Sequence, residues 1–123
     1  MPKKFLNIDG VKPPGYTHVV TASTGRPGTK LVFVSGRGYA GSHDFRTQCV
    51  NTFEDLEKCL ALAGATFKDV VKINYFITDL ANLAILREVR AKYLNMDAPP
   101  ASTLVQAGLI EPFLVEIECT AVI

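Results

Sequence analysis

Leu31-Val32-Phe33-Val34-Ser35 is the stretch of this sequence that decides its fold. Its residues Leu31 to Val34 form an unbroken apolar run, and such a run, rich in valine, is typical of a short strand. Successive side chains of a strand point to opposite faces, so a run that is apolar at every position predicts a strand buried on both faces. One layer of helices covers only one face of a sheet. The stretch therefore also predicts that sheets of separate copies pack against one another.

Two amphipathic helices are predicted on the carboxyl-terminal side of this strand. Apolar residues recur at steps of three and four over residues 45–63 and again over residues 83–93, which is the helical period. Ser42 or Asp44 can cap the first helix, and Gly64 suits the left-handed conformation that ends many helices.

Further strands are predicted at 18–22, 70–77, 103–109 and 114–122. Within 70–77, strict alternation predicts one face with the side chains Val71, Ile73, Tyr75 and Ile77. The expected order is β-β-β-α-β-α-β-β, in which one of the first three strands is given no range. This order defines an α+β fold with one sheet and two helices on one face, in a single domain over residues 1–123.

Composition excludes several classes of protein. The chain has 123 residues, 48% of them hydrophobic and 20% charged, which is ordinary for one globular domain. Its net charge is +1 without a basic block, so nucleic acid is an unlikely partner. No apolar run is long enough for a membrane span or a signal peptide, so we expect no membrane association and a cytoplasmic location.

The three cysteines predict buried thiols rather than a disulfide or a metal site. An odd count without a Cys-x-x-Cys motif favours a reducing compartment. Cys49 and Cys59 share the first predicted helix, which places their Cα atoms roughly 15 Å apart and excludes a bridge. With only two histidines, neither spaced as a ligand, no metal site is expected.

Residues 36–41 match the pattern G-x-G-x-x-G of dinucleotide-binding loops, after a strand and before a helix. The acidic residue expected about 20 positions later would fall inside the helix instead of at a strand end. Asp44 would also compete with a phosphate for the helix N-terminus. A flexible loop is therefore the favoured interpretation over nucleotide binding.

A pair of carboxylates is predicted on the last strand. Alternation places Glu116, Glu118 and Thr120 on one face. Two interpretations remain open from this pattern: a solvated face that keeps the strand soluble, or an interface cleft in which one acid orients a water molecule.

Several segments together resemble the Rid (YjgF) family of reactive-intermediate imine deaminases. The resemblance covers nearly the whole chain in the right order, and the matching segments are Pro14-Gly15-Tyr16, Leu31-Val32-Phe33-Val34-Ser35-Gly36, Phe76-Ile77-Thr78-Asp79-Leu80, Pro100-Ala101-Ser102-Thr103 and Val115-Glu116-Ile117-Glu118-Cys119-Thr120-Ala121-Val122. It implies a chorismate-mutase-like fold assembled as a homotrimer with three clefts between subunits. It also implies hydrolysis of imines and enamines to ammonia and a 2-keto acid, without a metal or organic cofactor.

The resemblance assigns roles residue by residue. Glu116 would hold the attacking water, Tyr16 would shape the pocket with it, and Ser35 and Gly36 would contribute backbone groups. The segment with the family's carboxylate-binding arginine here carries Ala101, with Thr103 two positions later as a further substrate-binding candidate, so this chain resembles an arginine-lacking subgroup with divergent specificity.

Two arginines stand where the family usually has other residues. Arg37 replaces a glutamine and Arg87 an asparagine, and either guanidinium could bind an anionic substrate in a shifted pose; a solvated helix face is the alternative for Arg87. The leading hypothesis is a cofactor-free deaminase-like hydrolase of a small imine or enamine. A non-catalytic, small-ligand-binding or chaperone-like trimer is the alternative, and an endoribonuclease is a third.

Overall fold

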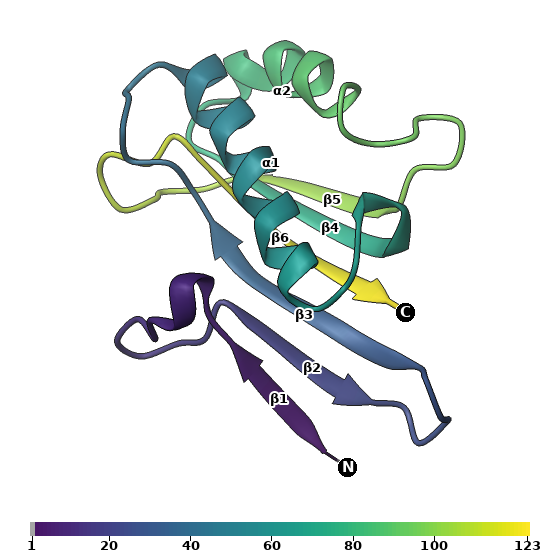
Figure 1. Cartoon of the computed structure of the whole chain (residues 1–123). Helices are drawn as coiled ribbons and strands as arrows, with labels where there is room; N and C mark the ends of the chain where they lie inside the picture. The colour runs from purple at the N-terminus through teal and green to yellow at the C-terminus, as the bar shows by residue number, and fades with distance from the viewer. Residues whose placement is uncertain (1) are drawn as a thin grey trace.

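The computed structural model describes residues 2–123, and over this range six strands form one mixed sheet in the order β1-β2-β3-β6-β4-β5 (Figure 1). Neighbouring strands are antiparallel except for β4 and β5, which are parallel. The elements are β1 Lys3–Leu6, β2 Val19–Ser23, β3 Lys30–Arg37, α1 Phe45–Leu62, β4 Val70–Ile77, α2 Leu83–Arg90, β5 Ala101–Gln106 and β6 Val115–Val122, with short 3₁₀ turns at Ile8–Gly10, Phe67–Asp69 and Leu80–Asn82.

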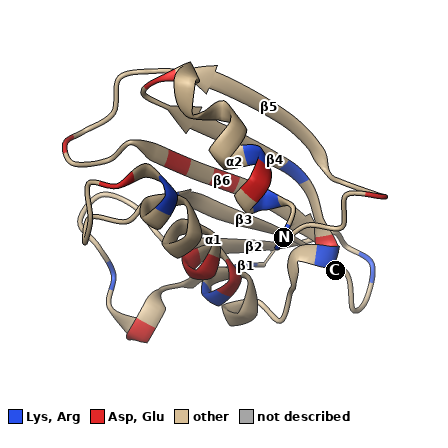
Figure 2. Cartoon of the chain, turned by 90° about the horizontal axis from the view of Figure 1, so that it is seen from above, with Lys and Arg blue, Asp and Glu red and all other residues tan. Residues whose placement is uncertain are grey.

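Both helices cover the same face of the sheet, as predicted (Figure 1). The apolar stripe of α1 packs onto buried residues of β3, β4 and β6, such as Val32, Ile73 and Ile117. Figure 2 shows acidic and basic residues mixed over α1 and α2. The outer surface of the helices therefore carries charges of both signs, and their inner surface forms the core.

The ends of α1 confirm the predicted caps. Asp44 is the N-cap, and its carboxylate accepts a hydrogen bond of 3.0 Å from the Thr47 backbone N–H. Gly64 follows the helix with φ of +78°, a conformation in which other residues are strained. Of the two candidate N-caps, the structure therefore selects Asp44.

Two strand predictions need correction. β4 has the predicted bounds, but the predicted shared face of Val71 with Ile73, Tyr75 and Ile77 is wrong. Those three residues are buried together with Val70, whereas Val71 is exposed, because the register with β6 shifts between Val70 and Lys72. The strand predicted at 103–109 is β5, Ala101–Gln106. It ends at Gln106 because that residue lies opposite Ile77, the last residue of its partner strand β4.

The face of the sheet opposite the helices is uncovered in the single chain. Phe33, in the stretch predicted to be buried on both faces, is 44% exposed there, and the side chains of Val122 and Val105 are exposed on the same face. Burial of this face by a second copy remains a prediction. No helix within residues 2–123 is both long enough and apolar enough to cross a membrane.

Candidate functional site

A cavity of about 500 Å³ lies at the end of the sheet where β3 ends and β6 begins. Five residues predicted from the sequence line it together with three that were not predicted: Tyr16, Ser35, Gly36, Arg37 and Glu116, and Gly38, Ile110 and Phe113. Residues far apart in the sequence meet here because β3 is hydrogen-bonded to both β2 and β6.

Glu116 supplies the carboxylate of this cavity. It lies near the start of β6, and its Oε1 packs against Gly36, where an added Cβ would come within 2.5 Å of that oxygen. No hydrogen bond or ion pair joins this carboxylate to another residue of the range 2–123, whereas Glu118 accepts a hydrogen bond of 3.1 Å from the Asn74 side chain. Of the two acids on this face, Glu116 is therefore the one free to bind a water molecule or a substrate.

Tyr16 forms an exposed wall of the cavity, packed edge-on against the His18 ring at 5.8 Å between centroids. The His18 Nδ1 accepts a hydrogen bond of 2.9 Å from the Ile8 backbone N–H, which requires an unprotonated Nδ1. Burial, and then the positive charge of Arg37, lower the pKa of His18. A neutral histidine therefore supports the tyrosine.

The Ser35 hydroxyl donates a hydrogen bond to the Thr17 backbone carbonyl. This bond joins the end of β3 to the segment that carries Tyr16, since Thr17 is the next residue in the chain. Ser35 therefore positions the tyrosine, and its hydroxyl hydrogen is already engaged.

Arg37 lines the cavity, but its guanidinium is paired with Asp55 of α1. A register shift after Val34 places Arg37 opposite Ile117, on the side of the sheet that faces the helices. Burial opposes the charged form, but the hydrogen bond and charge of Asp55 outweigh it and raise the pKa of Arg37. A substrate-binding role for Arg37 remains a prediction, and the pairing gives it a structural role as well.

Gln48 is a functional candidate that sequence reasoning missed. It lies on the inner face of α1 with no exposed surface, and its amide Nε2 donates to the carbonyls of Ser42 and Pro112 at 2.8 and 2.9 Å. Its Oε1 accepts from the Leu114 N–H at 2.8 Å. Gln48 thus ties the loop before α1 to the segment that presents Phe113. A polar residue within an apolar helical stripe was the available signal.

The remaining predicted residues lie elsewhere in the chain. Arg87 is exposed on α2, and Ala101 and Thr103 are exposed on the edge strand β5. Ala101 lies opposite Lys72 of β4, and Glu116 lies opposite Phe76 of the same strand. Ala101 and Glu116 are therefore separated by four residues along the strands, roughly 13 Å, and by two strand spacings across the sheet, roughly 10 Å. Thr103 accepts a hydrogen bond of 2.8 Å from the Lys72 ammonium. One copy of the chain does not bring this group to Glu116.

The glycine-rich segment 36–41 is explained by close packing. Cβ atoms at Gly36 and Gly38 would lie within 3 Å of the Glu116 and Phe113 side chains. These two glycines let the end of β3 approach β6 and the cavity closely. Asp44 occupies the helix N-terminus that a phosphate would need, which agrees with the loop interpretation.

The three cysteines are free and buried, as predicted. Burial raises the pKa of Cys49 and Cys119 to about 12 and that of Cys59 to about 11, so none is a thiolate nucleophile near neutral pH. No group of three or more potential metal-ligating side chains occurs in the part of the chain that the structure describes.

The chain is similar to known proteins along nearly its whole length. The family model described as "Endoribonuclease L-PSP" matches residues 14–123. A curated relative, protein mmf2, mitochondrial, from Schizosaccharomyces pombe, is 35% identical over 100 residues, which are 74% of this chain and 79% of the relative.

Solved structures agree with this match. RidA from an Antarctic Psychrobacter is 26% identical with a TM-score of 0.84, covering 98% of this chain and 99% of its own. A member of the YjgF/YER057c/UK114 family from Mycobacterium tuberculosis is 27% identical with a TM-score of 0.80, covering 99% and 100%. A YjgF-family protein from Neisseria meningitidis, 24% identical with a TM-score of 0.85 over 99% and 95%, has the same fold. This chain belongs to the Endoribonuclease L-PSP family, whose solved members include the YjgF and Rid proteins.

Proposed function

We propose that this protein is a cofactor-free deaminase-like hydrolase of a small imine or enamine derived from an amino acid. The observation that carries the proposal is the Glu116 carboxylate, which has no partner within residues 2–123 and lies in a cavity beside Tyr16. A free carboxylate beside a phenol can bind a water molecule and accept a proton from it.

The reaction needs few groups. Glu116 orients a water molecule, whose oxygen adds to the imine carbon while its proton passes through the carboxylate to the imine nitrogen. The resulting carbinolamine releases ammonia as the hydroxyl oxygen becomes a carbonyl. Water and imine are thus converted to ammonia and a keto compound.

A homotrimer would complete this site. Ala101 and Thr103 lie away from Glu116 in the same chain, so they can reach a Glu116 cavity only from a neighbouring copy. Arg87, exposed on α2, does not line the cavity of its own chain either. The uncovered sheet face with the exposed Phe33 supports such packing. Sedimentation at micromolar protein concentration is expected to give the mass of a trimer. The mass of a monomer would refute a site that is completed by a neighbouring copy.

An ammonia-release assay tests the chemistry. The substrates are 2-iminopropionate, other enzymatically generated imino acids and aminomuconate-like compounds. Glu116→Gln is expected to lose at least about 100-fold in rate. Glu118→Gln is the matched control, because it alters the neighbouring acid already bound to Asn74, and it should keep its rate within about threefold. Full activity in Glu116→Gln would refute the mechanism.

Position 101 tests the divergent specificity of an arginine-lacking subgroup. A methyl group cannot form the bidentate bonds by which arginine holds a carboxylate. Ala101→Arg is therefore expected to increase hydrolysis of 2-iminopropionate, and an unchanged or lower rate would count against this role for the position. A chain that binds small carboxylates but releases no ammonia from any substrate would instead be the non-catalytic trimer.

Ribonuclease activity is a second candidate, carried by the family description. The only cation that lines the Glu116 cavity, within residues 2–123, is Arg37, and it is paired with Asp55. An RNA backbone needs several free cations, so this cavity favours a small substrate. A cytoplasmic location remains a prediction, since the relative from Schizosaccharomyces pombe is named mitochondrial.

A further inference from the structure

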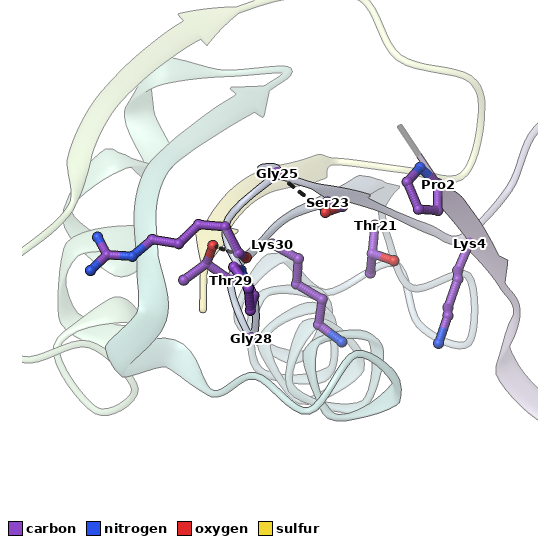
Figure 3. A pocket seen from close by; sticks show the side chains of 10 residues that line it. Pro2, Lys4, Thr21, Ser23, Gly25, Gly28, Thr29 and Lys30 are labelled. Carbon is purple, nitrogen blue, oxygen red and sulfur yellow. Dashed lines mark hydrogen bonds between the residues drawn. The ribbon is translucent and has the colours of Figure 1, made fainter.

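A second cavity, of about 410 Å³, lies at the other end of the β2–β3 hairpin from Glu116 (Figure 3). Its walls come from the start of the chain, the end of β2 and the turn that leads into β3. The lining residues are Pro2, Lys4, Thr21, Ser23, Gly25, Arg26, Pro27, Gly28, Thr29 and Lys30.

Three cations gather around this cavity. Strand register places Lys4 opposite Thr21 and Lys30 opposite Ser23, all on the side of the sheet that faces the helices. In Figure 3 the Lys4 and Lys30 side chains extend in the same direction, with Thr21 between them. Arg26, in the turn, is the third basic residue of the lining.

None of these cations is neutralised by an acid of the described chain. The lining contains no aspartate or glutamate, and the ion pairs found within residues 2–123 are Arg37–Asp55 and Arg46–Glu88. Like charges around one concave surface repel each other and raise the local concentration of anions. In a chain of net charge +1, this is a marked local excess.

Thr21 is a second feature of the site. It is only 3% exposed, yet it lines the cavity, so its side chain lies at the bottom of this concave surface. A threonine hydroxyl can donate a hydrogen bond to a ligand oxygen.

The rim of the cavity is already ordered. The Ser23 hydroxyl accepts a hydrogen bond of 3.2 Å from the Gly25 N–H, and the Thr29 hydroxyl donates to the Arg26 carbonyl at 2.8 Å. These bonds fix the turn between β2 and β3 without using the lysines. A ligand would therefore bind to a preformed site, with a small entropic cost for ordering the turn.

We propose that this cavity binds the phosphate group of a small phosphomonoester. A phosphate presents three terminal oxygens to separate cations and the Thr21 hydroxyl, whereas a carboxylate is better matched by a single planar guanidinium. The rings of Pro2 and Pro27 provide apolar surface for the organic part. A long nucleic acid is disfavoured, because the charges line one pocket without an aromatic platform for bases.

Calorimetric titration tests the site with ribose 5-phosphate, inorganic phosphate, ribose and an RNA oligonucleotide. Ribose 5-phosphate is expected to bind and ribose is not, while the result with inorganic phosphate shows whether the organic group contributes. Lys4→Met and Lys30→Met should each weaken binding about tenfold, the value of one charge-assisted hydrogen bond. Thr21→Val should weaken it a few-fold, and raised salt should weaken binding to the unaltered protein.

Lys12→Met is the matched control, because Lys12 is exposed and lies outside the cavity, and it should leave binding unchanged. Glu116→Gln should also leave it unchanged, which separates this site from the proposed hydrolase. The proposal is overturned if millimolar ribose 5-phosphate gives no binding, if Lys12→Met weakens binding as much as Lys4→Met, or if the lysine variants affect only binding of an RNA oligonucleotide.

Discussion

Replacing Gln48 by methionine is expected to destabilise the protein by about 3 kcal/mol. Methionine keeps the length of the side chain but makes none of the three hydrogen bonds, whose donor–acceptor distances are 2.8, 2.9 and 2.8 Å. Each such bond contributes about 1 kcal/mol net, and the loss is larger where the backbone partner stays buried. The cost arises from unpaired main-chain groups of Ser42, Pro112 and Leu114.

Urea denaturation measures this loss, and Gln106→Met is the control. Gln106 is exposed and makes one hydrogen bond, from the Leu80 N–H to its Oε1, so the same substitution should cost less than about 1 kcal/mol there. Equal losses for the two variants would refute the argument that Gln48 ties the two loops together. If the proposed hydrolase activity is present, Gln48→Met should also raise KM, because Phe113 lines the cavity.

Four further outcomes are expected. Gly36→Ala should displace the Glu116 carboxylate and lower the rate of ammonia release at least about tenfold, while circular dichroism shows a retained fold; a normal rate would contradict the position of Glu116. Thr52→Val should raise the unfolding free energy by about 1 kcal/mol, because the buried Thr52 hydroxyl has no partner within residues 2–123; a loss in urea denaturation would contradict this. The folded pKa of His18 is below 6.5, so the unfolded chain binds more protons and the unfolding free energy should fall as pH drops through 6.5. His18→Asn should flatten that dependence, and an unchanged slope would exclude His18 as its source. A thiol reagent should modify Cys49, Cys59 and Cys119 only after unfolding, and rapid reaction of the folded protein would contradict their burial.

The sequence predicted the fold well where periodicity is strong. The bounds of α1 and β4 follow the expected repeats closely, and Asp44 and Gly64 mark the ends of the first helix as their chemistry requires. The failures come from irregular pairing. Val71 departs from its predicted face because one extra residue enters β4, and no property of a single strand reveals where its neighbour shifts.

The candidate site was predictable only in part. Alternation placed Glu116 and Glu118 on one face, but choosing between them required the contact of Glu118 with Asn74, which lies 44 residues away in the sequence. Arg37 faces the helices because of a second register shift. The role of Gln48 depends on two loops that approach each other only in the folded chain, so its sequence position suggested an inner helical face and no more.

The position of β6 within the sheet has a consequence for synthesis of the protein. β6 is formed from residues 115–122 yet lies between β3 and β4, which do not pair with each other. Until the ribosome has synthesised these residues, β1, β2 and β3 form one group of strands and β4 and β5 another, and the strand edges that β6 would join are unpaired. Nascent chains that lack them expose those edges to other polypeptides, so chaperones that bind emerging chains would be needed most before residues 115–122 have left the ribosome.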